Sequence, residues 1–171
     1  MSAGTSNDRW LGVAVVLAAV AYVFTTRDVS AAESDQSTAT GNDVSGNGFA
    51  INNPLNIRYL SSNAFNGQTG NHNGYGVYSS LAYGVRAGFL ELSDYIARGL
   101  DTVTQIISTW APSSENNTAA YISDVSGRMG VDANEPLSWP DDAVDLIQAM
   151  AWHENGYNKM LDSDVESYIS S

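Results

Sequence analysis

The sequence predicts a mostly α-helical domain with a small irregular or β lobe, preceded by an N-terminal transmembrane helix and a flexible linker. Three observations lead to this prediction. Four segments after residue 80 repeat apolar residues at helical spacing. A segment rich in Gly and Asn lies ahead of them, and an uncharged apolar run lies near the N-terminus. The length of 171 residues suits one compact domain.

The apolar run follows a short N-terminal tail, residues 1–9. Residues 10–24 hold fifteen apolar residues without a charge, and two threonines extend the uncharged run to residue 26. This length is at the short limit of a membrane span, so we predict an anchor at residues 10–26. The alternative is a cleaved signal peptide, for which Ser30-Ala31-Ala32 offers small residues at a cleavage site. A single arginine before the apolar run favours the anchor.

A linker, residues 27–48, separates this anchor from the domain. Between residues 30 and 48 the chain is almost entirely Ala, Ser, Thr, Gly, Asn and acidic residues. Such a composition is typical of a flexible tether, and equally of a poorly ordered segment without a role of its own. We place the domain at residues 49–162 and a C-terminal tail at residues 163–171.

The predicted lobe begins with a strong turn signal, Asn52-Asn53-Pro54. Asn tolerates turn geometry and Pro fixes φ, so the chain is expected to turn there and then to run extended. Residues 63–80 are rich in Gly and Asn and contain Tyr75, Val77 and Tyr78. This pattern predicts an irregular loop or a small hairpin.

Four helices are predicted within residues 81–99, 101–112, 113–130 and 138–156, from apolar residues spaced three and four apart. Helix starts are expected at three capping residues: Asp101, Ser114 and Ser138. Helix ends are expected at Gly99, Pro112, Gly130 and Gly156. No internal repeat is present.

The composition excludes several classes of partner and site. The chain has 7 Lys and Arg and 19 Asp and Glu, which gives a net charge of -12. This charge argues against nucleic acid as a partner and against a protein that binds membrane surfaces through a polybasic patch. Without cysteine there is no disulfide, thiolate nucleophile or Cys-type zinc site. The two histidines, His72 and His153, cannot form a three-His metal site. We therefore expect no metal and no cofactor.

Glu154 is the first candidate for chemistry. It continues a stripe with Val144, Ile147 and Ala151, at spacings of three, four and three. Partial burial and the negative end of a helix both favour a protonated carboxyl group, which is what a general acid requires. The alternative is a frayed last turn that exposes Glu154 to water, and periodicity alone slightly favours it.

Two segments resemble proteins that cleave bacterial cell walls. The run "AMAWHENGYN" resembles the helix end of lytic transglycosylases and related muramidases, where an Ala-rich helix terminates in a catalytic Glu. "NNPLNIRY" is similar to a segment of phage-encoded, lysozyme-like virion proteins and to the Asn-rich motif of flagellar-type N-acetylglucosaminidases. "WAPSSENNTAAY" is the most specific piece of a resemblance that spans residues 47–160. It implies a lysozyme-like fold. Because Glu154 comes last here and first in most transglycosylases, the fold would be circularly permuted.

The resemblance also implies a function. The expected activity is cleavage of the N-acetylmuramic acid–N-acetylglucosamine strand by a lytic transglycosylase or muramidase, in a phage virion or facing the periplasm. Glu154 would be the acid, and Glu115 is a second carboxylate that could lie across a cleft or simply begin a helix. Glycan contacts are expected from six residues: Asn53, Asn56, Arg58, Tyr59, Tyr78 and Tyr121. Expected partners are peptidoglycan, a membrane through residues 10–26, and other virion proteins.

A different class of function fits the same sequence. The domain could be a structural virion protein or a glycan-binding module that keeps the fold without cleaving anything. Such a protein needs no acid at position 154, so the surroundings of Glu154 discriminate between the two.

Overall fold

The computed structural model describes residues 47–61 and 65–171 of the chain, which are mostly helical with a small two-stranded sheet. The predicted anchor at residues 10–26 and nearly all of the linker lie outside the described residues. Among the residues described, no helix is both long and apolar enough to span a bilayer.

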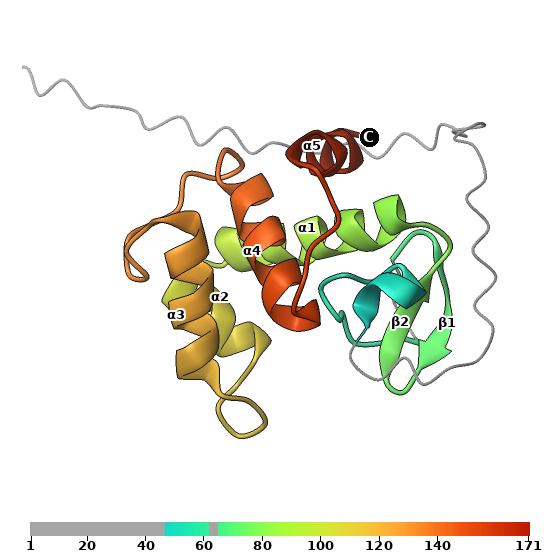
Figure 1. The fold of residues 1–171 in the computed structure, drawn as a ribbon, viewed down its shortest axis with the longest axis horizontal. Helices are drawn as coiled ribbons and strands as arrows, with labels where there is room; N and C mark the ends of the chain where they lie inside the picture. Colours follow the sequence, from blue (N-terminus) through green and yellow to red (C-terminus); the bar gives the residue numbers. More distant parts are fainter. Residues whose placement is uncertain (1–46, 62–64) are drawn as a thin grey trace, which may run out of the picture. The chain divides into compact units, whose positions relative to one another are not determined.

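Helix α4, Ala143–Asn155, is the central element of the helical part. Figure 1 shows α3, Thr118–Met129, beside it and α1, Leu81–Ala97, crossing behind it, and it packs against both. Leu146, Ile147 and Met150 of α4 are completely buried. α2, Val103–Trp110, packs against α3 and contributes Ile106 and Ile107 to the same core. The four predicted helices are therefore confirmed.

The helices begin later than the sequence predicted. Thr102, not Asp101, caps α2, and its hydroxyl accepts from the backbone N–H of Gln105 in a capping box. Asn117, not Ser114, caps α3, because residues 112–116 form a turn. α4 starts at Ala143 rather than after Ser138, since the Ser138 backbone N–H donates to the Asp142 carboxylate in a preceding turn. Near each of these helix starts more than one residue is of a type that caps helices, and capping propensity alone does not distinguish among them.

A fifth helix, α5, Asp162–Ser170, occupies most of the segment that the sequence assigned to a C-terminal tail. It packs against α1 and α4, and its Val165 is fully buried (Figure 1). Val165, Tyr168 and Ile169 are its only apolar residues, too few for a clear stripe among serines and acids. Tertiary packing against α1 therefore stabilises a helix that its own sequence only weakly favours.

The lobe ahead of α1 contains a hairpin of β1, Gln68–His72, and β2, Tyr75–Tyr78. Asn73 and Gly74 connect the strands with positive φ at both positions, which is the two-residue turn that Asn-Gly favours. Segment 57–59 runs along β2, where the Gly76 N–H donates to the Ile57 carbonyl. Of the two alternatives predicted for residues 63–80, an irregular loop or a small hairpin, the hairpin is the one observed.

Asn155, at the end of α4, joins the lobe to the helices. Its Oδ1 accepts from the backbone N–H of Gly48 at 2.7 Å, in the short 3-10 helix η1, Gly48–Ile51. Its Nδ2 donates to the Pro54 carbonyl at 2.8 Å and to the Ala151 carbonyl at 2.7 Å. A Cβ at Gly48 would lie 2.2 Å from the Asn53 carbonyl oxygen, so only glycine allows this close approach. The last turn of α4 is therefore held against the lobe instead of fraying.

Candidate active site

Glu154 lies in the last turn of α4, half-buried, with both carboxylate oxygens hydrogen-bonded. Oε2 accepts from the Asn56 Nδ2 at 2.8 Å. Oε1 accepts from the Tyr121 hydroxyl at 2.8 Å. The exposed position at a frayed helix end, which periodicity slightly favoured, is therefore not the one observed. The acid sits where the lobe, α3 and α4 meet, and two neutral donors fix the plane of its carboxyl group.

The turn at residues 53–56 aims Asn56 at Glu154. The Asn56 N–H donates to the Asn53 carbonyl, and Asn56 itself adopts a left-handed conformation with φ 51°. Asn tolerates this region better than other non-glycine residues, because its side chain can bond locally. The completely buried Asn53 supports the turn: its Nδ2 donates to the Ile57 and Gly76 carbonyls, and its Oδ1 accepts from the Ile57 N–H.

Tyr121 reaches Glu154 from the first turns of α3, and its side chain is buried. Burial, and next the negative charge of Glu154, raise the pKa of Tyr121 well above its ordinary value. The phenol therefore keeps its proton and acts as a hydrogen-bond donor. This contact gives Tyr121 a role in holding the acid, whereas the sequence assigned it to glycan contact.

Glu115 and Arg58 form an ion pair away from the acid. Arg58 Nη2 lies 3.1 Å from Glu115 Oε2, and both side chains are more than half exposed. The Arg58 guanidinium also lies over the Tyr75 ring, 5.2 Å from its centroid. The structure brings Glu115 to Arg58 and not into hydrogen-bond contact with Glu154, so it is not a carboxylate partner of the acid in this arrangement.

The remaining predicted glycan contacts divide into surface and core residues. Tyr59 is half-buried, and its backbone N–H donates to the Gly74 carbonyl. Asn53 and Tyr78 are buried, Tyr78 with only 2% of its surface exposed. Neither can touch a glycan from that position, which corrects both expectations: alternation along β2 turns Tyr78 toward the core.

The sequence did not single out Asn155 or Asp124. Asn155 joins the lobe to α4, and Asp124 bonds to His153 at 3.0 Å. Asp124 follows Tyr121 by three residues on α3, and this shared helix face could have indicated it. Among the described residues, no group of three His, Asp or Glu side chains is arranged to hold a metal ion.

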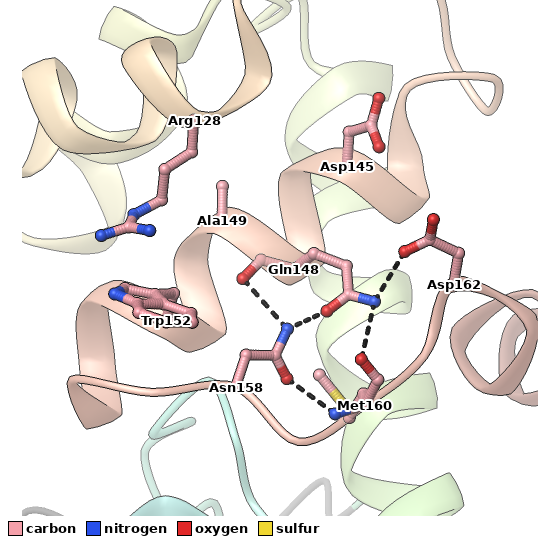
Figure 2. Close-up of a pocket in the computed structure, with 8 residues that line it drawn as sticks. All are labelled: Arg128, Asp145, Gln148, Ala149, Trp152, Asn158, Met160 and Asp162. Atoms are coloured by element: carbon pink, nitrogen blue, oxygen red, sulfur yellow. Dashed lines mark hydrogen bonds between the residues drawn. The ribbon is translucent and has the colours of Figure 1, made fainter.

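A hollow of about 570 Å³ lies on another face of α4 (Figure 2). It is lined by Arg128, Asp145, Gln148, Ala149, Trp152, Asn158, Met160 and Asp162. Gln148 Nε2 donates to the Met160 carbonyl and to Asp162 Oδ1, while Asn158 Nδ2 donates to the Gln148 side chain. These amide donors fasten the segment after α4 to the helix, and Glu154 is not among the lining residues.

Comparison with known proteins gives a phage relative. No family model matches the chain. The chain is 33% identical over 117 residues to Protein P5 of Pseudoalteromonas phage PM2, a match that covers 65% of this chain and 72% of the relative. The chain belongs to the Protein P5 family.

Proposed function

We propose that this protein cleaves the glycan strands of peptidoglycan as a lytic transglycosylase, with Glu154 as its acid. The observation that carries the proposal is the contact between Glu154 and Asn56. The two segments with the resemblance to cell-wall enzymes, "HENG" and "NNPLNIRY", are far apart in the sequence and meet at this one carboxyl group. A solvated helix end has no need of two donors supplied by two other parts of the chain.

The proposed first step uses Glu154 in its protonated form. The acid donates its proton to the glycosidic oxygen between N-acetylmuramic acid and N-acetylglucosamine, and the bond from that oxygen to C1 of the muramyl sugar breaks. Glu154 becomes a carboxylate. The Tyr121 hydroxyl and the Asn56 amide then stabilise this charged form, because each donates a hydrogen bond to one of its oxygens.

In the second step, the muramyl 6-hydroxyl oxygen attacks C1 and its proton passes to the Glu154 carboxylate. The product is a 1,6-anhydro sugar, and the acid regains the proton that it gave. One carboxyl group is sufficient for this sequence. A hydrolase would require a second carboxylate or a positioned water. The pairing of Glu115 with the Arg58 guanidinium supports the single-acid mechanism over a muramidase.

The Protein P5 relationship supports a phage setting. We place the protein in a virion or facing the periplasm, tethered by residues 10–26, where a wall-cleaving domain would open the peptidoglycan during infection. The alternative is a structural virion protein or glycan-binding module without activity. Its strongest support is that Glu154 accepts two hydrogen bonds, since a carboxylate so satisfied can also serve a purely structural joint between lobe and helices.

Digestion of purified peptidoglycan separates these functions. Full-length protein is incubated with insoluble glycan, and released products are identified by mass. Anhydro-muropeptides are expected from the wild type and none from Glu154→Gln. Products with a free reducing end would identify the protein as a muramidase instead of a transglycosylase. A wild type that releases nothing, where a control muramidase does, would favour the structural protein.

A further inference from the structure

A row of side chains leads from the surface of α3 to the acid. Arg128 Nε lies 3.0 Å from Asp124 Oδ1, and Asp124 Oδ2 lies 3.0 Å from His153 Nδ1. The His153 ring is stacked on the Tyr121 ring, with 3.7 Å between centroids and 18° between planes. Tyr121 then donates to Glu154. Together these groups connect two turns of α3 to the last turn of α4.

The His153 imidazole is fixed on its edge and on one face. A carboxylate can only accept, so the Nδ1 atom facing Asp124 carries the proton. The Tyr121 ring lies against the face of the imidazole, and rotation of the Tyr121 side chain about its Cα–Cβ bond would carry the hydroxyl away from Glu154. The stacked imidazole occupies the space on one face of the phenol ring and so blocks movement of the ring toward that side. His153 therefore restricts Tyr121 to the orientation in which its hydroxyl meets the acid.

Arg128 and Trp152 keep Asp124 in place. The Arg128 guanidinium lies 4.6 Å from the centroid of the Trp152 ring, and Figure 2 shows the two side chains facing each other. Burial alone would raise the pKa of Asp124, but hydrogen bonds from Arg128 and His153 outweigh it and lower that pKa. Asp124 therefore remains an ionised acceptor for His153 over the neutral range of pH.

We propose that His153 is a positioning residue that acts on Glu154 only through Tyr121. This inference rests on the proposed function for its catalytic consequence, because it assigns the support of the same acid. Although His153 precedes Glu154 in the chain, its side chain makes no hydrogen bond to the Glu154 carboxyl group among the described residues; its bond is to Asp124. Its effect must then disappear when Tyr121 has no hydroxyl to place.

A double-mutant cycle on glycan cleavage tests this dependence. Tyr121→Phe removes a hydrogen bond to a charged group, so kcat should fall about tenfold with KM within about twofold. His153→Ala should lower kcat by a similar factor, and the double variant should be less than about twofold slower than Tyr121→Phe. His153→Phe keeps a flat ring and should restore most of kcat. Three results would each overturn the inference. The effects of the two single substitutions on kcat could multiply in the double variant, kcat could be unchanged in His153→Ala, or His153→Phe could fail to restore kcat.

A second measurement separates this inference from the proposed function. Tyrosine labelled at Cζ gives an NMR signal for Tyr121 that reports its hydrogen bond without any turnover. Glu154→Gln introduced into the wild-type protein should shift the Tyr121 signal. The same substitution introduced into the His153→Ala variant should leave that signal nearly unchanged. Equal shifts in both backgrounds would show that His153 does not position Tyr121. An inactive wild type that still shows the expected NMR difference would disprove the enzyme and retain the positioning role.

Discussion

The Glu154 carboxylate accepts the Asn56 amide at 2.8 Å although 98 residues separate the two in the sequence. This contact places the acid at the joint between the lobe and α4, and Asn155 fastens the same joint from the next position along the chain. A carboxyl group held in this way has a fixed direction, which a catalytic acid needs and which a freely rotating surface glutamate lacks.

Replacement of Glu154 by Gln should abolish peptidoglycan cleavage while the fold stays intact. The amide is nearly isosteric and can still accept from Tyr121, but it cannot donate a proton to a leaving oxygen. General acid catalysis contributes about 10²–10⁴-fold, so the rate of product release should fall by at least that factor. Quantitative mass analysis of soluble products measures the loss, and circular dichroism checks the fold.

Glu115→Gln is the matched control for that variant. It removes an exposed carboxylate that pairs with Arg58, so the activity of a single-acid transglycosylase should stay within about threefold, in keeping with the small energy of exposed ion pairs. Activity abolished by Glu115→Gln would instead identify a second catalytic carboxylate.

Asn56→Gly should reduce turnover without damaging the turn that carries it. Glycine adopts the left-handed conformation that Asn56 occupies at φ 51°, so the change removes only the amide. Loss of a hydrogen bond to the charged Glu154 should lower kcat by roughly tenfold or more. Steady-state kinetics on soluble glycan fragments measures this change.

Asn73→Gly provides the comparison for Asn56→Gly. Asn73 is also left-handed, with φ 52°, but it lies in the exposed hairpin turn. The kcat of the Asn73→Gly variant should equal that of the wild type. Equal losses in the two variants would mean that backbone flexibility of the lobe, and not the bond to Glu154, accounts for the effect.

Asn53→Ala should lower the free energy of unfolding of the domain, because it removes several buried hydrogen bonds at once. The completely buried amide makes three hydrogen bonds to backbone groups of Ile57 and Gly76. Each buried group left without a partner costs about 1–3 kcal/mol, so the free energy of unfolding should fall by at least about 2 kcal/mol. Urea denaturation measures the change. The exposed Asn66, replaced by Ala, should change it by less than about 0.5 kcal/mol.

Alkaline pH should weaken the fold through three buried tyrosines. Burial, and next the Glu91 charge, raise the pKa of Tyr95 to about 12, and the pKa values of Tyr78 and Tyr121 are also raised, in both cases chiefly by burial. Unfolded tyrosines ionise near pH 10. Because the folded-state pKa values are the higher ones, stability from these phenols is complete below about pH 10 and is lost as pH rises through the folded values. Urea midpoints measured from neutral to alkaline pH follow this loss.

Tyr78→Phe identifies which phenol contributes to that pH dependence. The Tyr78 hydroxyl is buried and has no hydrogen-bond partner among the described residues. Its removal should leave stability at neutral pH unchanged or slightly higher, and should make the alkaline loss shallower. A variant with an unchanged alkaline slope would show that Tyr78 does not contribute.

Local patterns in the sequence determined the helices α1 to α4, the hairpin and the end of α4. Apolar residues at helical spacing specify a buried face wherever the helix packs, and Asn73-Gly74 supplies positive φ for a two-residue turn. Gly156 adopts φ 72° just after α4, as expected of glycine at that position. These features depend on neighbouring residues alone, so they could be predicted without knowledge of the fold.

Tertiary structure alone decided the partners of Glu154, the burial of Tyr78 and the formation of α5. The spacing of Glu154 on its helix predicted the face but not the donors, since Asn56 and Tyr121 lie 98 and 33 residues away in sequence. A strand pattern does not say which of its faces meets the core, and Val165 of α5 gains burial only where α1 and α4 present apolar surface. Burial and side-chain hydrogen bonding are energies between distant parts of a chain, and the chain must be folded before they are defined.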